Sequence, residues 1–203
     1  MTSILKAFPD LLSAALLFAL WAEPERFGIE WFRSGVLALM LEFFVIHAGG
    51  FMAVTVLDPE ATPRARMLRL AGWSTGYLLF ISLFALGFDA WWMVAAFAWF
   101  CFSKVQAIWT GAPPTERDRT HAITSWALSV AVFLGSVFAT VMYDVPQLGA
   151  TPDVRDAAGF NAKGGVWEAE PHRALAGAVL YFTLMGLSRP LLARAFAVRR
   201  AAG

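Results

Sequence analysis

Residues 35–57 read GVLALMLEFFVIHAGGFMAVTVL, an apolar stretch that contains one acid and one imidazole. A helix of about 20 apolar residues is long enough to cross the hydrocarbon core of a bilayer. Burying an ionised side chain in such a helix costs about 3 kcal/mol on insertion scales. The stretch therefore predicts a membrane-spanning helix, and Glu42 and His47 within it are candidate functional residues.

The same pattern recurs along the chain, and it predicts an all-α, polytopic membrane protein. Lys6, Pro9 and Asp10 make the first segment the weakest, but Leu20 and Trp21 stand where signal peptidase needs small residues, so we expect a retained helix. We expect one transmembrane domain over residues 1–203, a six-helix bundle with a long outer loop at 144–171. The six spans lie at about 4–22, 35–57, 67–88, 90–109, 121–143 and 172–195.

The composition indicates lipid as the solvent and excludes several functions. Of the 203 residues, 59% are hydrophobic and only 15% are charged, whereas soluble domains carry about 25% charged residues. A net charge of +1 argues against a nucleic-acid partner, because phosphate binding needs clustered Lys and Arg. Cys101 is the only cysteine, which excludes an intrachain disulfide.

The distribution of Lys and Arg predicts the orientation. With six spans, both termini and the second and fourth loops share one side of the membrane. That side carries eleven Lys and Arg against five on the other, and cytoplasmic loops are the Lys- and Arg-rich ones. We therefore expect a bacterial cytoplasmic (inner) membrane with both termini cytoplasmic. The basic segment RPLLARAFAVRR, residues 189–200, is expected to rest on anionic headgroups.

Small residues predict where helices pack. In lipid, helices approach one another through Gly, Ala, Ser and Thr. The fifth span carries a small-residue ridge with a strict spacing of four, and the third span carries a GxxxG pair. These residues favour either a compact bundle or a homo-oligomer, and the sequence leaves the two alternatives open. They are Ala127, Ala131, Gly135 and Ala139 in the ridge, and Gly72 and Gly76 in the pair.

The polar residues of the outer half predict one site beneath the long loop. Glu42 lies about 12 Å into its span at 1.5 Å per residue, and His47 lies near the midplane. The segment EAEPHR, residues 168–173, brings Glu168, Glu170, His172 and Arg173 to the start of the sixth span. Such a cluster can relay protons, bind a small polar substrate or hold a metal ion.

Each of these residues also has a structural interpretation. Glu42 can pair with Arg173, or it can be protonated, because desolvation raises the pKa of a carboxyl group. His47 can be a hydrogen-bonded structural histidine. Ser74, Thr75 and Gln106 extend a polar path inward, unless the hydroxyl groups bond to their own helices.

A metal site is the least supported chemistry of the cluster. Two histidines and a carboxylate can ligate a first-row metal, and the candidate ligands are His47, His172, Glu168 and Glu170. However, no two histidines share a face of one helix. Haem is not expected, because His47, His121 and His172 lie at different depths. We expect no other cofactor.

The leading functional hypothesis is a small channel or carrier with Glu42, His47, His172 and Arg173 in or beside its pathway. The first alternative is a non-catalytic accessory subunit of a larger membrane complex. A metal-dependent membrane enzyme is the least favoured alternative, and no catalytic residue is predicted. The expected partners are the lipid bilayer and either copies of the same chain or the subunits of a complex.

Overall fold

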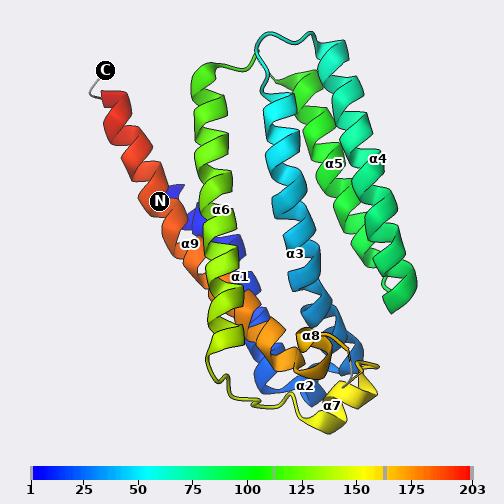
Figure 1. Ribbon diagram of the computed structural model, residues 1–203. Helices are drawn as coiled ribbons and strands as arrows, with labels where there is room; N and C mark the ends of the chain where they lie inside the picture. Colours follow the sequence, from blue (N-terminus) through cyan, green and yellow to red (C-terminus); the bar gives the residue numbers. More distant parts are fainter. Residues whose placement is uncertain (1, 112, 162–163, 202–203) are drawn as a thin grey trace. The chain divides into compact units, whose positions relative to one another are not determined.

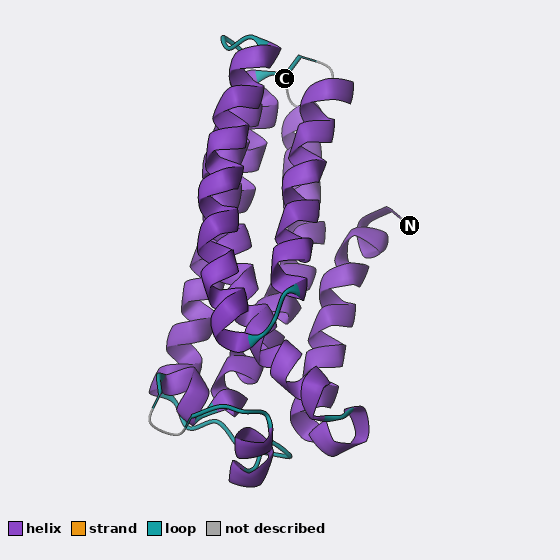
Figure 2. Cartoon of the chain, turned by 90° about the vertical axis from the view of Figure 1, so that its right-hand side faces the viewer, coloured by secondary structure: helices purple, strands orange, loops and turns teal. Residues whose placement is uncertain are grey.

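The computed structural model describes residues 2–111, 113–161 and 164–201, and these residues form helices joined by loops (Figure 1). No strand occurs in these ranges (Figure 2), so the predicted all-α class is confirmed. The long helices are α1 (Thr2–Ala22), α3 (Ile29–Val56), α4 (Pro63–Phe88), α5 (Trp92–Thr110), α6 (Glu116–Met142) and α9 (Pro171–Ala201). The short helices are α2 (Pro24–Phe27), α7 (Pro152–Ala157) and α8 (Val166–Ala169).

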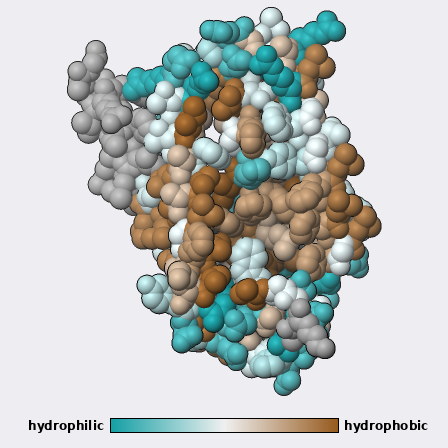
Figure 3. All heavy atoms as spheres, in the orientation of Figure 1, coloured by the Kyte–Doolittle hydropathy of each residue, from teal (hydrophilic) through white to brown (hydrophobic). Residues whose placement is uncertain are grey.

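Within the described residues, four helices are long and apolar enough to cross a membrane: α3, α4, α5 and α6. The apolar part of α1, Ala7–Ala22, is shorter than a span. Hydrophobic side chains cover the middle of the helices and hydrophilic side chains gather toward their ends (Figure 3). This distribution is compatible with a membrane protein. The expected headgroup contacts of the basic segment 189–200 lie outside the described side chains.

Several helices begin earlier than the apolar segments because capping residues set their first turns. The Thr62 hydroxyl accepts a hydrogen bond from the Ala65 N–H at 3.2 Å, so α4 begins at Pro63. At the start of α6, the Asp118 N–H donates to the Thr115 hydroxyl at 3.2 Å, and the Thr115 N–H donates to the Asp118 carboxylate at 3.0 Å. This reciprocal pair is a capping box. Hydropathy thus located the apolar parts of the helices, whereas polar caps determine where the helices begin.

The chain forms two compact units. The first contains the described residues of 1–39 and 132–203, and the second contains those of 40–131. Helices α3 and α6 contribute to both units, because each passes without a break from one set of residues into the other. The expectation of one transmembrane domain stays a prediction.

The first unit is built on the contact between α1 and α9, the most extensive pairing of helices in the chain. A Cβ atom at Gly186 of α9 would lie 2.8 Å from the Leu11 side chain of α1, so only glycine permits this approach. Gly35 of α3 lies equally close to α1 and α9, because its Cβ would lie 3.1 Å from both Leu20 and Leu175. Glycine therefore lets three helices meet here.

The segment between α6 and α9, expected to be a long loop, contains α7 and α8 and packs on its own unit. The Trp21 indole at the end of α1 donates to the carbonyls of Pro146 (3.2 Å) and Gln147 (3.1 Å). The Gly149 N–H returns a hydrogen bond to the Trp21 carbonyl at 3.1 Å. A Cβ atom at Gly149 would lie 2.6 Å from the Ala22 carbonyl oxygen, so this position needs glycine.

The second unit is held together by contacts between aromatic side chains and by the packing of α4 against α5. These helices are joined by a tight connection, in which Asp89 adopts a left-handed conformation with φ +48°. Ile81 of α4 and Met93 and Phe97 of α5 are completely buried. The ring of Phe44 from α3 packs against Phe80 and Phe84, with centroid distances of 5.3 and 5.2 Å. Apolar and aromatic contacts therefore position the face of α3 that carries His47.

Candidate functional site

The centre of the candidate site is a hydrogen bond between His47 of α3 and Tyr77 of α4. The Tyr77 hydroxyl lies 2.6 Å from Nδ1 of His47. The imidazole is stacked on Phe43 at a centroid distance of 5.9 Å and meets the edge of Phe51 at 5.4 Å. The side chain of His47 is nevertheless exposed. The arrangement thus fixes one ring nitrogen and leaves part of the imidazole accessible.

Trp126 of α6 is hydrogen-bonded to the backbone of α3 at the residue before His47. The Trp126 indole N–H donates to the Ile46 carbonyl at 2.9 Å. A Cβ atom at Gly50 would lie 2.6 Å from the Trp126 ring, so the indole reaches α3 only because residue 50 is glycine. This glycine therefore allows the close approach of Trp126 to α3.

Of the polar residues expected to extend the path, only some have contacts with a neighbouring helix. Ser74 lies one turn before Tyr77 on α4 and hydrogen-bonds to Cys101 of α5. Thr75 and Gln106 are exposed on their helices. The Lys104 ammonium lies 4.8 Å from the centre of the Phe100 ring, a cation–π contact. The geometry therefore joins His47 to Tyr77, and the extension of this pair to a polar path stays a prediction.

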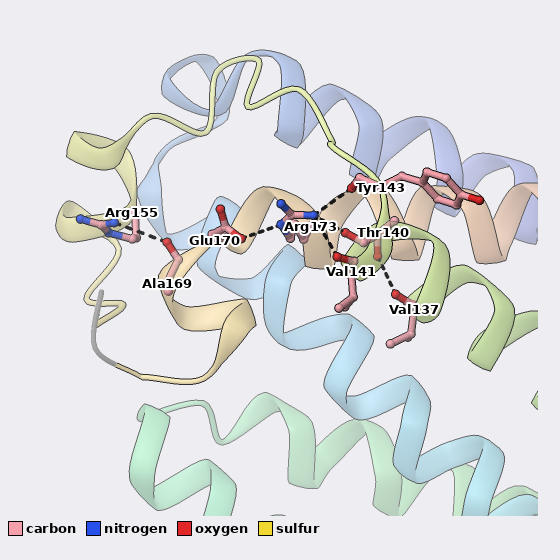
Figure 4. A network of polar contacts seen from close by, with 8 residues as sticks. All are labelled: Val137, Thr140, Val141, Tyr143, Arg155, Ala169, Glu170 and Arg173. Atoms are coloured by element: carbon pink, nitrogen blue, oxygen red, sulfur yellow. Dashed lines mark hydrogen bonds and ion pairs between the residues drawn. The ribbon is translucent and has the colours of Figure 1, made fainter.

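The second group of predicted residues surrounds the start of α9 in the first unit (Figure 4). Nε of Arg173 lies 2.6 Å from the Glu170 carboxylate. Its Nη1 reaches the end of α6 and donates to the carbonyls of Thr140 at 2.7 Å and Tyr143 at 2.9 Å, with a longer contact of 3.5 Å to Val141.

These contacts give Arg173 a structural role. The last carbonyls of a helix have no partner within the helix, and the C-terminal end of a helix attracts positive charge. The guanidinium satisfies both requirements for α6. The side chain of Arg173 is 14% exposed. Glu42, for which the sequence analysis gave a pair with Arg173 as one alternative, belongs to the second unit, and that pairing is not tested.

His172 lies beside this network and is 3% exposed. It lines a small cavity of about 20 Å³ between the α6–α7 connection, α7 and the start of α9. A cavity of this size holds one water-sized species. The lining residues are Gln147, Ala150, Thr151, Pro152, Arg155, Ala169, Pro171 and His172.

The six residues of the predicted cluster thus fall into two groups. Glu168, Glu170, His172 and Arg173 lie around α8 and the start of α9, in the first unit, whereas Glu42 and His47 lie on the part of α3 in the second unit. No group of three or more His, Cys, Asp or Glu side chains is arranged to hold a metal ion within the described ranges. The union of the two groups in one site stays a prediction.

The predicted packing residues are exposed in the described structure, except Ala139, which is half-buried. Ala127, Ala131 and Gly135 are exposed on α6. A Cβ atom at Gly135, Gly72 or Gly76 would meet no described atom within 4 Å. In the described structure, α6 instead buries Phe133, Ser136 and Thr140. A contact of the small-residue ridge with a second chain therefore stays a prediction.

The sequence analysis missed Tyr77, Trp126 and Arg155 as contributors to the two groups. A signal for the first two was present, because a Tyr hydroxyl or Trp N–H within an apolar helix usually finds a hydrogen-bond partner. Arg155 gave no comparable signal, since its Nη1 binds a backbone carbonyl, that of Ala169, at 3.4 Å.

No protein-family model, curated protein or solved structure matches this chain. The functional argument therefore rests on the two groups of residues.

Proposed function

We propose that this chain is a small channel or carrier of a bacterial cytoplasmic membrane, and that a proton or a small polar solute passes beside His47. In this proposal, the six long helices cross the membrane with both termini cytoplasmic. The charge distribution of eleven Lys and Arg against five supports this orientation.

The observation that carries the proposal is the 2.6 Å hydrogen bond between His47 and Tyr77. Histidine is the side chain whose ordinary pKa lies closest to neutral pH. A Tyr hydroxyl can donate or accept, so the pair can pass a proton in either direction. Ionisable groups within membrane helices mark ion and proton pathways in many transporters.

The surroundings of His47 support transport over a merely structural bond. Its imidazole is exposed rather than enclosed, although the rings of Phe43 and Phe51 hold it in one orientation. Glu42 lies five residues earlier on α3, toward the outer side in the proposed orientation. We assign Glu42 to the entrance of the pathway.

Proton flux into proteoliposomes tests this proposal. The purified chain is reconstituted with a pH-sensitive dye inside, and an imposed potential drives the flux. We expect His47→Gln to lower the flux at least tenfold and Glu42→Gln to change its pH dependence. The matched control is His121→Gln, which alters an exposed histidine of α6 and should preserve the flux. Wild-type flux in His47→Gln, with the protein folded, would refute the proposal.

A second candidate function is an accessory subunit, and the exposed ridge of α6 favours it. Small residues on lipid-facing helices promote close helix contacts, and Gly135 has open space around it. Native mass spectrometry of gently extracted protein separates the two functions. A homo-oligomer favours a channel or carrier, whereas a fixed assembly with other polypeptides favours a subunit. Gly135→Leu should dissociate either assembly without unfolding the chain, and an unchanged assembly would contradict the role of the ridge.

A further inference from the structure

An exposed group of aromatic side chains surrounds His47 in the second unit. Phe43 and Phe51 lie one turn to either side of His47 on α3, and Trp73 of α4 is stacked on Phe51 at a centroid distance of 4.7 Å, with 27° between the ring planes. Phe43, Phe51 and Trp73 are 43%, 41% and 40% exposed. We call these three residues and His47 the ring surface. It offers flat aromatic area from two helices around one imidazole.

The hydrogen bond to Tyr77 determines which nitrogen of His47 carries the hydrogen. The Tyr77 hydroxyl lies 2.6 Å from Nδ1, a separation typical of an O–H donor and shorter than the usual N–H···O range of about 2.7–3.2 Å. Among the described residues, this hydroxyl has no other acceptor. The hydroxyl therefore donates to Nδ1, and the neutral imidazole carries its own hydrogen on Nε2.

The Nε2–H group is thus the free polar group of the ring surface. Within the described part of the chain, His47 has no hydrogen-bond partner besides Tyr77, and its side chain is exposed. Its ring contacts, with Phe43, Phe51 and Tyr77, are all with uncharged groups. The hydrocarbon core of a bilayer contains no acceptor, and an unmet donor there is costly. A lipid-soluble molecule that accepts a hydrogen bond would remove this cost.

Three properties of the ring surface define the chemistry of its ligand. The N–H donor selects an acceptor oxygen and disfavours a cation. The uncharged surroundings disfavour an anion, because an unpaired charge in an apolar medium is costly. The exposed rings favour a flat ring, since aromatic systems stack on one another. An uncharged, planar, lipid-soluble molecule with a carbonyl group on its ring meets all three requirements, whereas a phospholipid has no flat ring.

We propose that the ring surface binds a membrane quinone, whose carbonyl oxygen accepts a hydrogen bond from Nε2–H of His47 and whose ring stacks on the exposed aromatic side chains. Binding involves no redox step and does not require transport beside His47. A bound quinone would occupy the imidazole that the proposed transport uses, so it should inhibit any flux. Because binding is measured without flux, a chain that binds quinone and conducts nothing would refute transport alone.

Thermal unfolding of the full, delipidated chain in detergent tests the proposal. The quinone is decylubiquinone, and the matched molecule is decylbenzene, which has a ring and the same tail but no carbonyl group. A ligand that binds only the folded state raises Tm with its concentration. We expect decylubiquinone, but not decylbenzene, to raise Tm by about 2–4 °C, the shift that a modest binding energy produces in a chain of this length. Equal Tm values with the two molecules would overturn the proposal.

His47→Phe keeps a ring and removes the N–H donor, so the quinone-dependent rise should be lost. The matched control is His121→Phe, which changes an exposed histidine of α6 and should retain the rise. Trp73→Leu removes a stacking partner and should weaken quinone binding about twofold to tenfold. Trp99→Leu, at an indole of α5 that is 72% exposed, should leave it unchanged. A rise that persists in His47→Phe would place the quinone elsewhere and overturn the assignment.

A measurement on the wild-type protein covers the case in which His47→Phe fails to fold. Nitrogen NMR of the histidine-labelled chain should show the hydrogen of His47 on Nε2, and the Nε2 resonance should move when decylubiquinone is added. The resonances of His121 and His172 should stay in place. A hydrogen on Nδ1 of His47, or an Nε2 resonance that decylubiquinone does not move, would overturn the proposal.

Discussion

The two units hold their principal polar side chains in opposite ways. In the first unit, Arg173 is 14% exposed and binds backbone carbonyls at the end of α6 as well as Glu170. In the second unit, His47 is exposed and its contacts are a hydroxyl group and aromatic rings. Backbone partners tie Arg173 to the framework, whereas the contacts of His47 leave part of its imidazole exposed. The difference supports a structural role for Arg173 and is the basis of the transport role proposed for His47.

The largest expected effect is that of Arg173→Met, which removes the guanidinium from the α6 end. Because hydrogen bonds to charged groups contribute about 1.5–3 kcal/mol each and are not additive, we expect a loss of about 3 kcal/mol in the free energy of unfolding. Denaturant titration of the purified protein measures it. Arg66→Met is the control, since among the described residues Nη1 of Arg66 binds only the Val56 carbonyl, at 3.1 Å, and it should cost about 1.5 kcal/mol. Equal losses would remove the special role of Arg173.

Gly50→Ala should destabilise the second unit by about 2 kcal/mol, because the added methyl group would lie 2.6 Å from the rigid Trp126 indole. The adjacent glycine is a close control. A Cβ atom at Gly49 would meet only Phe100, at 3.8 Å, and alanine is favoured over glycine in a helix by up to about 1 kcal/mol. Gly49→Ala should therefore be neutral or stabilising in the same titration. A loss shared by both variants would contradict the packing of Trp126 on α3.

The bond between His47 and Tyr77 should contribute little to stability and much to flux. A double-mutant cycle of His47→Gln and Tyr77→Phe is expected to give a coupling energy of about 1 kcal/mol, the typical net value of one hydrogen bond. Flux measured on the same variants should fall in both. Stable variants with wild-type flux would show that the bond between His47 and Tyr77 has no role in transport. The proposed difference in role between His47 and Arg173 would then be refuted.

The smallest expected effect is at the exposed start of α6. Hydrogen bonds from the Thr115 hydroxyl and then the Thr115 N–H lower the pKa of Asp118 below its ordinary value. The stabilisation is therefore present above the pKa of the unfolded carboxyl and is lost as pH falls through the lower, folded pKa. Amide hydrogen exchange in the first turn should show faster opening in Asp118→Asn than in the wild type near neutral pH. This difference should shrink in acid, and a difference independent of pH would contradict the carboxylate's role.

Hydropathy was sufficient to locate the helices, because each apolar segment must bury or shield its backbone in the same way wherever it lies. It was insufficient for their ends. Thr62 and Thr115 are ordinary polar residues in composition, and only their hydrogen bonds to Ala65 and Asp118 make them caps. The three short helices α2, α7 and α8 were missed because helices of this length carry no measurable periodicity.

The sequence pointed to His47 and Arg173 as candidates, but not to the groups that they contact. The cost of a buried imidazole pointed to His47, and the clustered charges before the last helix pointed to Arg173. The partners of Arg173 include three carbonyl groups, and a carbonyl group is present at every position of a sequence. Tyr77 lies 30 residues from His47, and nothing in the local pattern of either helix specifies that they meet.

The anchoring of the α6–α7 connection by Trp21 has a consequence for how the chain resists proteases. A connection between two long helices is normally where a protease cuts first, because cleavage requires several residues of backbone to become extended. From Pro146 to Gln147 the carbonyls are bound by the Trp21 indole, and Gly149 is bound to the Trp21 backbone. Digestion of the purified protein should therefore spare this stretch, and a Trp21→Leu variant should be cleaved there.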